Sequence, residues 1–344
     1  MDDFSNRHLR ISVVDAIGPA FNHMAKVLFK PFSFIKWVKF GLVAFMVTLG
    51  AGGGSGFNFN PSLFRDAKTF PKIDSYITNV TQWIESHLML IIILGIVALL
   101  VITIIWTILI YFCSRFSFVY LDGVIKNDLQ IKQAYKESRT NGWSYFLWNI
   151  IFVPTALLII LLLIGVPATF IVIAGITEGF SLTIILLLVL LGLVLIALII
   201  LLAVISVFTI DFVVPIMYLR KIRVLDAWKI LLALIKPNKL QFFLYILMRI
   251  GLILAAATLL IIPCCLLGCC FFIPAIALVV GLGYLAFQYP LIWILVVSCA
   301  LIAWFIGSWL HQTIISPITV FFRIYPLVFL EGFGVEFLSI NQPR

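Results

Sequence analysis

The stretch of sequence that decides the fold is FSLTIILLLVLLGLVLIALIILLAVISVFTI, residues 180–210. It lies between Glu178 and Asp211, and it contains no charged side chain. A helix needs roughly 20 mostly apolar residues to cross the hydrocarbon core of a bilayer. This stretch is long enough for one crossing, so it predicts a transmembrane helix.

Four other charge-free stretches occur along the chain, at residues 40–64, 86–114, 140–177 and 250–322. Each is long enough to cross a membrane, and the last, with 73 residues, has room for two crossings. Of the 344 residues, 64% are hydrophobic and only 11% are charged, whereas a soluble domain has about 25% charged residues. Because one soluble core cannot bury this excess, the composition excludes a soluble enzyme, a disordered chain and a nucleic-acid-binding protein.

We therefore predict an all-α polytopic membrane bundle of about six transmembrane helices, arranged as three hairpin units with amphipathic helices on the cytoplasmic side. Similar aromatic entries before the third and fifth spans, YFLW at 145–148 and FFLY at 242–245, indicate an internal repeat. The predicted segments are a cytoplasmic N-terminal segment at 1–36, hairpin units at 37–140, 141–239 and 240–344, an outer loop at 53–87, and spans at 37–52, 88–112, 145–175, 180–210, 241–262 and 291–312.

The third unit contains an additional segment at 263–290, bounded by Pro263 and Pro290. Non-helical backbone inside a membrane is tolerated only where protein or water covers it. We predict a broken or re-entrant segment on the outer side here, and an interfacial C-terminal segment at 313–344. If residues 264–287 cross fully instead, the count becomes seven and the C-terminus moves outside.

The cationic residues give the orientation, because Lys and Arg accumulate in cytoplasmic segments. Seventeen of the 23 Lys and Arg residues lie in segments 1–39, 115–143 and 220–239. The outer loop at 53–87 carries only three, and three acidic residues offset them. The net charge of +9 is therefore a topology signal, which predicts a multi-pass protein of the inner (plasma) membrane with a cytoplasmic N-terminus.

Residues 11–28 have the spacing of an amphipathic helix. Its apolar face is predicted to consist of Ile11, Val14, Ile17, Phe21, Met24 and Leu28. Such a helix either lies in the inner interface, with its lysines near anionic head groups, or packs against cytoplasmic loops of the same chain. The expected partners are membrane lipids through anionic head groups at the inner face, and no nucleic acid; protein partners and homo-oligomers stay open.

The densest group of potential metal ligands is formed by Cys264, Cys265, Cys269 and Cys270. On a helix, Cys265 and Cys269 share a face and could hold a soft metal together with outside partners. Thiolate ligands require deprotonation, which an apolar neighbourhood without cations disfavours. Packing is therefore favoured over a disulfide or a metal site, and the sequence predicts no cofactor. No arrangement typical of catalytic residues is visible either.

Ionisable residues in or near the bilayer are the default candidates for function. Arg249 lies eight residues into the fifth span and Asp211 ends the fourth, so the two can form an ion pair if these spans are neighbours. The alternative is that Arg249 snorkels to the phosphates of the inner leaflet. Glu178, at the outer start of the fourth span, and Arg115, at the inner end of the second, are further interface candidates.

Four short segments carry a family resemblance: KPFSFIKW at 30–37, the glycine run leading into FNFNP at 57–61, DFVVPIMY at 211–218, and FRIY with FLEGFG within 322–334. With these segments the chain resembles a group of uncharacterised bacterial multispanning proteins that carry a domain-of-unknown-function label. It is also loosely similar to the membrane region beside some glycerophosphodiester phosphodiesterases. The resemblance implies a bacterial inner-membrane protein and transfers no catalytic residue.

Two classes of function follow. The first is a non-enzymatic scaffold or partner subunit that organises lipid or proteins, and it is favoured because no acidic residue lies mid-span and no substrate-binding group of residues is visible. The second is a transporter or lipid-handling protein with a path between the hairpins. A continuous polar cavity that reaches Arg249 or Asp211 would favour the second class. An enzymatic activity has the least support.

Overall fold

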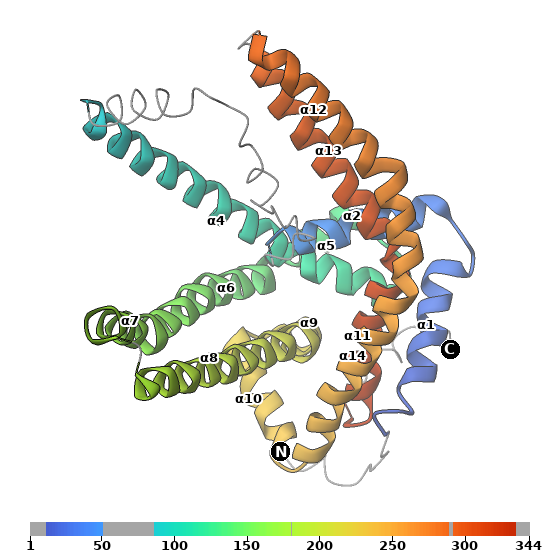
Figure 1. Cartoon of the computed structure of the whole chain (residues 1–344). Coiled ribbons are helices and arrows are strands. Elements are labelled where there is room, and N and C mark those ends of the chain that lie inside the picture. Colours follow the sequence, from blue (N-terminus) through green and yellow to red (C-terminus); the bar gives the residue numbers. More distant parts are fainter. Residues whose placement is uncertain (1–11, 51–85, 180, 289–291, 335–344) are drawn as a thin grey trace, which may run out of the picture.

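Figure 1 shows the computed structural model of the chain, which describes residues 12–50, 86–179, 181–288 and 292–334. These residues form an all-helical fold without strands, which confirms the predicted fold class of a polytopic helical bundle. The predicted outer loop at 53–87 lies outside the described residues except for its last two.

The helices follow one another in short succession along the chain. They are α1 (Ile17–Phe29), α2 (Phe34–Gly50), α4 (Leu88–Lys126), α5 (Ile131–Glu137), α6 (Arg139–Ile160), η2 (Leu161–Gly165), α7 (Val166–Glu178), α8 (Leu182–Phe208), η3 (Thr209–Val213), α9 (Val214–Arg220), α10 (Val224–Ile235), α11 (Lys239–Leu267), η4 (Gly268–Phe272), α12 (Ile273–Gln288), α13 (Ile292–Ile314) and α14 (Ser316–Glu331), where η denotes a π-helical turn.

Five continuous helical stretches among the described residues are long and apolar enough to cross a membrane. They are Leu88–Lys126, Arg139–Thr177, Leu182–Arg220, Lys239–Gly283 and Ile292–Ile314. The count becomes six if α1 and α2, which meet at a bend of 116°, form one span. The apolar side chains of these stretches are mostly exposed, as expected for surfaces that face lipid.

The long helices diverge from a common centre, where α1, α2 and α14 lie (Figure 1). After residue 88, the five long stretches carry the chain between the outward tips and this centre. Tyr325 of α14 donates a hydrogen bond to the carbonyl of Val13 beside α1, at 3.2 Å, so both ends of the described chain lie at the centre. Among the described residues before 88, α2 covers most of the predicted span 37–52 and is the candidate for a sixth passage.

The prediction of a broken or re-entrant segment at 263–290 is wrong, because α11, η4 and α12 run as one continuous helix through Pro263 and Pro274. A proline lacks the N–H that would bond to a carbonyl one turn earlier. In each of the π turns η2, η3 and η4, a proline follows two residues after the turn ends, at Pro167, Pro215 and Pro274. The wider turn absorbs the proline, so the helix continues where a break was expected.

The buried core lies at the inner ends of the long helices rather than between the predicted spans. The helix of the second span continues past residue 112 to Lys126, and its last two turns are buried. Residues 324–330 of α14, within the segment at 313–344 that was predicted to be interfacial, are almost completely buried in this core. Aromatic stacking explains the burial: the rings of Tyr325 and Tyr245 lie 5.3 Å apart and nearly parallel.

Helix α1 packs on the core through a face that shares only Met24 and Leu28 with the predicted one. Its buried side chains are Val13 and Ala16, which precede the helix, with Ala20, Met24, Val27 and Leu28. The predicted members Val14 and Phe21 are instead 60% and 57% exposed. Ala16 and Ala20 are completely buried, and α1 packs against α14. Small side chains allow two helices to approach closely, which the hydrophobic spacing used for the prediction does not take into account. Ile11 lies outside the described residues.

Candidate functional site

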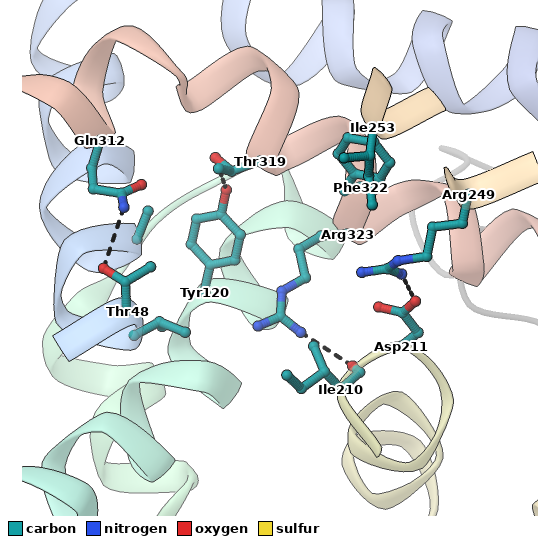
Figure 2. A pocket seen from close by; sticks show the side chains of 12 residues that line it. Thr48, Tyr120, Ile210, Asp211, Arg249, Ile253, Gln312, Thr319, Phe322 and Arg323 are labelled. Atoms are coloured by element: carbon teal, nitrogen blue, oxygen red, sulfur yellow. Dashed lines mark hydrogen bonds and ion pairs between the residues drawn. The ribbon is translucent and has the colours of Figure 1, made fainter. Parts of the chain in front are cut away.

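A pocket of about 260 Å³ lies where helices from all three hairpin units meet (Figure 2). Its walls come from α2, α4, η3, α11, α13 and α14. The polar lining side chains are Thr48, Tyr120, Asp211, Arg249, Gln312, Thr319 and Arg323, and the apolar ones are Ala44, Val47, Ile210, Ile253 and Phe322. The surface of the pocket is mostly apolar, and the polar side chains that reach it include both Arg249 and Asp211.

The π turn η3 shapes one wall of this pocket. Its hydrogen bonds span five residues, as Val214 N–H donates to the carbonyl of Thr209. The next donor in this register would be residue 215, which is a proline without an N–H, so the carbonyl of Ile210 lacks its helical partner. Arg323 of α14 supplies the missing donor, with Nη1 donating to that carbonyl at 3.2 Å. A buried carbonyl is costly to leave unpaired, which explains why Arg323 points here.

The same π turn presents Asp211 to α11. Asp211 is 1% exposed, and its Oδ2 forms an ion pair with Nη1 of Arg249. Tyr245 donates its hydroxyl hydrogen to the same carboxylate at 2.8 Å and accepts a hydrogen bond from Arg249 at 3.3 Å. The structure therefore brings together the two residues for which the sequence predicted pairing or snorkelling, and Tyr245 completes the cluster.

Two further hydrogen bonds fix the polar side chains on the opposite wall. Tyr120 donates to Oγ1 of Thr319 at 3.0 Å, and Nε2 of Gln312 donates to Oγ1 of Thr48 at 3.3 Å (Figure 2). Gln312 is 8% exposed, and its Oε1 has no hydrogen-bond partner among the described residues. The pocket wall therefore contains one buried hydrogen-bond acceptor, Oε1 of Gln312, that has no donor among the described residues.

The pocket carries an excess of positive charge. Arg249 and Arg323 lie close enough for their charges to repel each other, and Asp211 neutralises only one of them. Burial lowers the pKa of Arg323, because an apolar surrounding disfavours the guanidinium charge, and this effect outweighs the opposing influence of the Tyr145 and Tyr120 hydroxyls. A bound anion would compensate the remaining charge.

The other predicted interface residues lie away from this pocket. Arg115 is buried in an aromatic cluster, with its guanidinium 3.7 Å from the ring centre of Tyr135 and bonded to the carbonyl of that residue. Glu178 is the last residue of α7, at an outward tip of the molecule (Figure 1). Neither contributes to the lining of the pocket.

The cysteine group lies on the helix of η4 and its neighbours. Cys265, Cys269 and Cys270 are exposed, Cys264 is half-buried, and all four thiols are free. Within the described residues, no group of three or more His, Cys, Asp or Glu side chains could hold a metal ion. The exposed thiols therefore face the surroundings of the helix rather than a common centre.

Sequence reasoning missed Arg323 and Gln312 as site residues. The sequence offers one signal for Arg323, because it ends the longest charge-free stretch and precedes the buried part of α14. Its partner, the carbonyl of Ile210, could not be predicted without the tertiary structure. Gln312 carries no charge, so the spacing of charges gives no indication of its role.

A comparison of the sequence with known families gives one match. A family described as a family of unknown function, DUF7544, matches residues 11–340, and the chain belongs to this family. No curated protein and no solved structure matches the chain. The family agrees with the resemblance to uncharacterised multispanning proteins, whereas similarity to the membrane region beside glycerophosphodiester phosphodiesterases is not shown.

Proposed function

We propose that this protein is a lipid-handling membrane protein whose pocket receives an anionic head group. The observation that supports the proposal is the meeting of Arg249, Asp211 and Arg323 in one cavity. A cavity lined by charged side chains supports a lipid-handling protein over a scaffold, because a scaffold needs no such cavity. The proposal therefore takes the place of the scaffolding role that the sequence favoured.

The chemistry of the lining suits the polar part of a lipid rather than a whole lipid. Ligand pockets for larger molecules have volumes of about 300–1,000 Å³, and this cavity, at about 260 Å³, is smaller. Guanidinium groups bind phosphate and carboxylate oxygens with paired donors. An acyl chain attached to such a head group would leave along the apolar side of the cavity, where Ile253 is 47% exposed.

The pocket is proposed to open toward the cytoplasmic leaflet of an inner membrane. The cationic segments at 115–143 and 220–239 flank the inner ends of the long helices, where the pocket lies. Lys and Arg accumulate on the cytoplasmic side, and anionic lipids attract them there. If the pocket opens toward the cytoplasmic leaflet, the N-terminal helix α1 is cytoplasmic as well, because α1 packs on the same core.

Lipid-dependent stabilisation of the purified protein in a neutral detergent tests the proposal. A ligand that binds only the folded state at 100 times its Kd stabilises it by about 2.7 kcal/mol. We expect an anionic phospholipid to raise the unfolding temperature of the wild type by a corresponding amount, and a zwitterionic one to have a much smaller effect. Equal effects of the two lipids would contradict the proposal.

Two variants with a matched control locate the binding. Arg323→Gln should remove most of the anionic-lipid effect, while Lys229→Gln, which removes a charge from a side chain that is 77% exposed, should keep it. Because Arg323 also bonds to Ile210, a second variant is needed that leaves every charge in place. Ile253→Trp fills the apolar side of the cavity and should also weaken the lipid effect. A scaffold that binds lipid only through its surface would respond to neither pocket variant.

A further inference from the structure

The charged side chains of the pocket and the Gln312 acceptor, which has no partner within the described residues, together specify more than a general preference for anions. Two arginines and one aspartate leave one positive charge uncompensated among its lining residues. In a poorly solvated site, a mismatch of one charge is costly, so the charge of the ligand should equal the excess of the site. A ligand with one negative charge neutralises the pocket, whereas a neutral zwitterion or a dianion leaves a charge uncompensated.

Arg323 is the cation that is available for this ligand. Nη1 of Arg249 is engaged by Asp211, and the carboxylate holds that guanidinium against η3. Arg323 has one hydrogen bond to protein among the described residues, to the carbonyl of Ile210, out of the five N–H donors of a guanidinium. Its remaining donors lie in the pocket wall and suit two oxygens of a phosphodiester or carboxylate.

Gln312 adds a second requirement for the ligand, a hydrogen-bond donor. The orientation of its amide group follows from its hydrogen bond with Thr48. Thr48 donates its own hydroxyl hydrogen to the carbonyl of Phe45 at 2.9 Å, so Thr48 Oγ1 can only accept from Gln312. The amide NH₂ of Gln312 must therefore face Thr48, and the carbonyl oxygen Oε1 is the atom without a partner among the described residues. The side chain is more than nine-tenths buried and lines the pocket, so a hydroxyl of a bound ligand would supply the missing donor.

We infer that the pocket selects a lipid head group that combines a single negative charge with a hydroxyl donor, as a phosphodiester of glycerol does. This inference rests on the proposed function. The oxygens of the phosphodiester bind Arg323, and a hydroxyl on the same head group donates to Oε1 of Gln312. An ammonium could also donate to Gln312, but it would bring a positive charge into a pocket that already has an excess of one.

Matched lipids separate the two requirements. Phosphatidylglycerol and phosphatidylethanol are both monoanionic phosphodiesters, and only the first carries hydroxyls on its head group. Phosphatidic acid is a phosphate monoester that has no alcohol hydroxyl on its head group and carries about 1.5 to 2 negative charges at pH 7, and phosphatidylethanolamine is a zwitterion. For the wild type in neutral detergent, we expect phosphatidylglycerol to bind about tenfold tighter than each of the other three, as one well-placed hydrogen bond or one matched charge provides. Equal affinities would overturn the inference.

Two variants assign the preferences to residues. Asp211→Asn raises the excess to two charges and should shift the preference toward the more highly charged phosphatidic acid, by about tenfold relative to the wild type. Asp226→Asn, at a side chain that is 53% exposed, is the matched control and should change nothing. Gln312→Met should abolish the difference between phosphatidylglycerol and phosphatidylethanol while both still bind. A wild-type pattern of preferences that survives either pocket substitution would contradict the assignment.

The outcomes distinguish this inference from the function on which it rests. If Ile253→Trp leaves the binding of every lipid unchanged, the pocket is not the lipid site and the proposed function fails. If Ile253→Trp weakens binding but the head groups bind equally, only the selectivity inferred here fails. Water-soluble glycerophosphoglycerol, a monoanionic phosphodiester without acyl chains, is the last probe: competition at concentrations equal to those of the lipid would assign the site to a soluble anion, and its absence supports a lipid.

Discussion

At the scale of single residues, the buried pair of Asp211 and Arg249 shapes the charge of the pocket. Asp211 is 1% exposed and Arg249 is 16% exposed, and Tyr245 bonds to both. Burying two charges is unfavourable unless each satisfies the other, and removing one partner leaves the other uncompensated. Asp211 is therefore a fixed internal counter-ion of Arg249, and the one excess positive charge of the pocket belongs to Arg323.

The first prediction concerns this pair. Arg249→Leu should destabilise the protein by about 3–5 kcal/mol, because the carboxylate of Asp211 then lies buried without a partner. Adding Asp211→Leu should recover most of this loss, since two apolar side chains can replace a buried pair. Chemical unfolding in detergent measures both changes. The exposed pair of Asp226 and Lys229 is the control, and breaking it should cost less than about 1 kcal/mol. A side chain that merely snorkels would give a small loss and no recovery.

Residue-level features were predictable from the sequence only where charge was rare. Arg249 and Asp211 stand beside long apolar stretches, so they attract attention as intramembrane candidates. Arg323 is equally isolated, but its role depends on a carbonyl orphaned by Pro215 more than 100 residues earlier. Gln312 is one polar residue among many, and only its burial distinguishes it.

At the scale of elements, a π turn lies just before a proline in three of the long helical stretches, and it explains why each helix continues past that proline. The starts of the long helices at Leu88 and Leu182 lie within two residues of the predicted span starts, because the charged residues Glu85 and Glu178 precede these apolar stretches. The helix that begins at Leu88 ends at Lys126 rather than at residue 112, because its last turns are buried in a core that charge spacing does not reveal. Prolines suggested a break at 263–290, yet a wider turn accommodates Pro274 within one helix.

A proline substitution tests whether η3 positions the site. Pro215→Ala restores an N–H that can bond to a carbonyl one turn earlier, so the π turn should relax toward α-helix and rotate Asp211 away from Arg249. We expect unchanged or higher helix content with weaker binding of anionic lipid, measured as the lipid-dependent rise in unfolding temperature. Pro167→Ala changes the same pattern in η2, outside the pocket, and should leave lipid binding intact. Equal effects of the two substitutions would show that η3 has no special role.

At the scale of the whole molecule, the outward helices contact one another mainly in pairs and meet at the core (Figure 1). The α12 and α13 pair, the α7 and α8 pair and α4 point in different directions, with exposed apolar side chains along them. The pocket lies at their meeting point and takes its lining from six elements. A relative movement of the hairpins would therefore change the pocket directly.

The arrangement makes a prediction about topology. Reporter fusions after Lys132 and Lys229 should both read as cytoplasmic, because these residues lie on the core side of the long helices. Fusions after Ser75 and Arg344, outside the described residues, should read outside and inside the cell, as six spans require. An outside signal after Arg344 would contradict the packing of α14 beside α1, since these helices must share one side of the membrane.

The central claim is that an anionic head group enters the pocket, and photo-crosslinking tests it most directly. A phosphatidylglycerol analogue with a photoreactive group at its head group would be incorporated into membranes that contain the wild-type protein, and the labelled peptides identified by mass spectrometry. We expect labels at the pocket residues of α11, α13 and α14, including peptides that carry Gln312 and Arg323. These labels should be lost in Ile253→Trp. Labels confined to the exposed lysines of α1 and α10, with none in the pocket, would contradict the central claim.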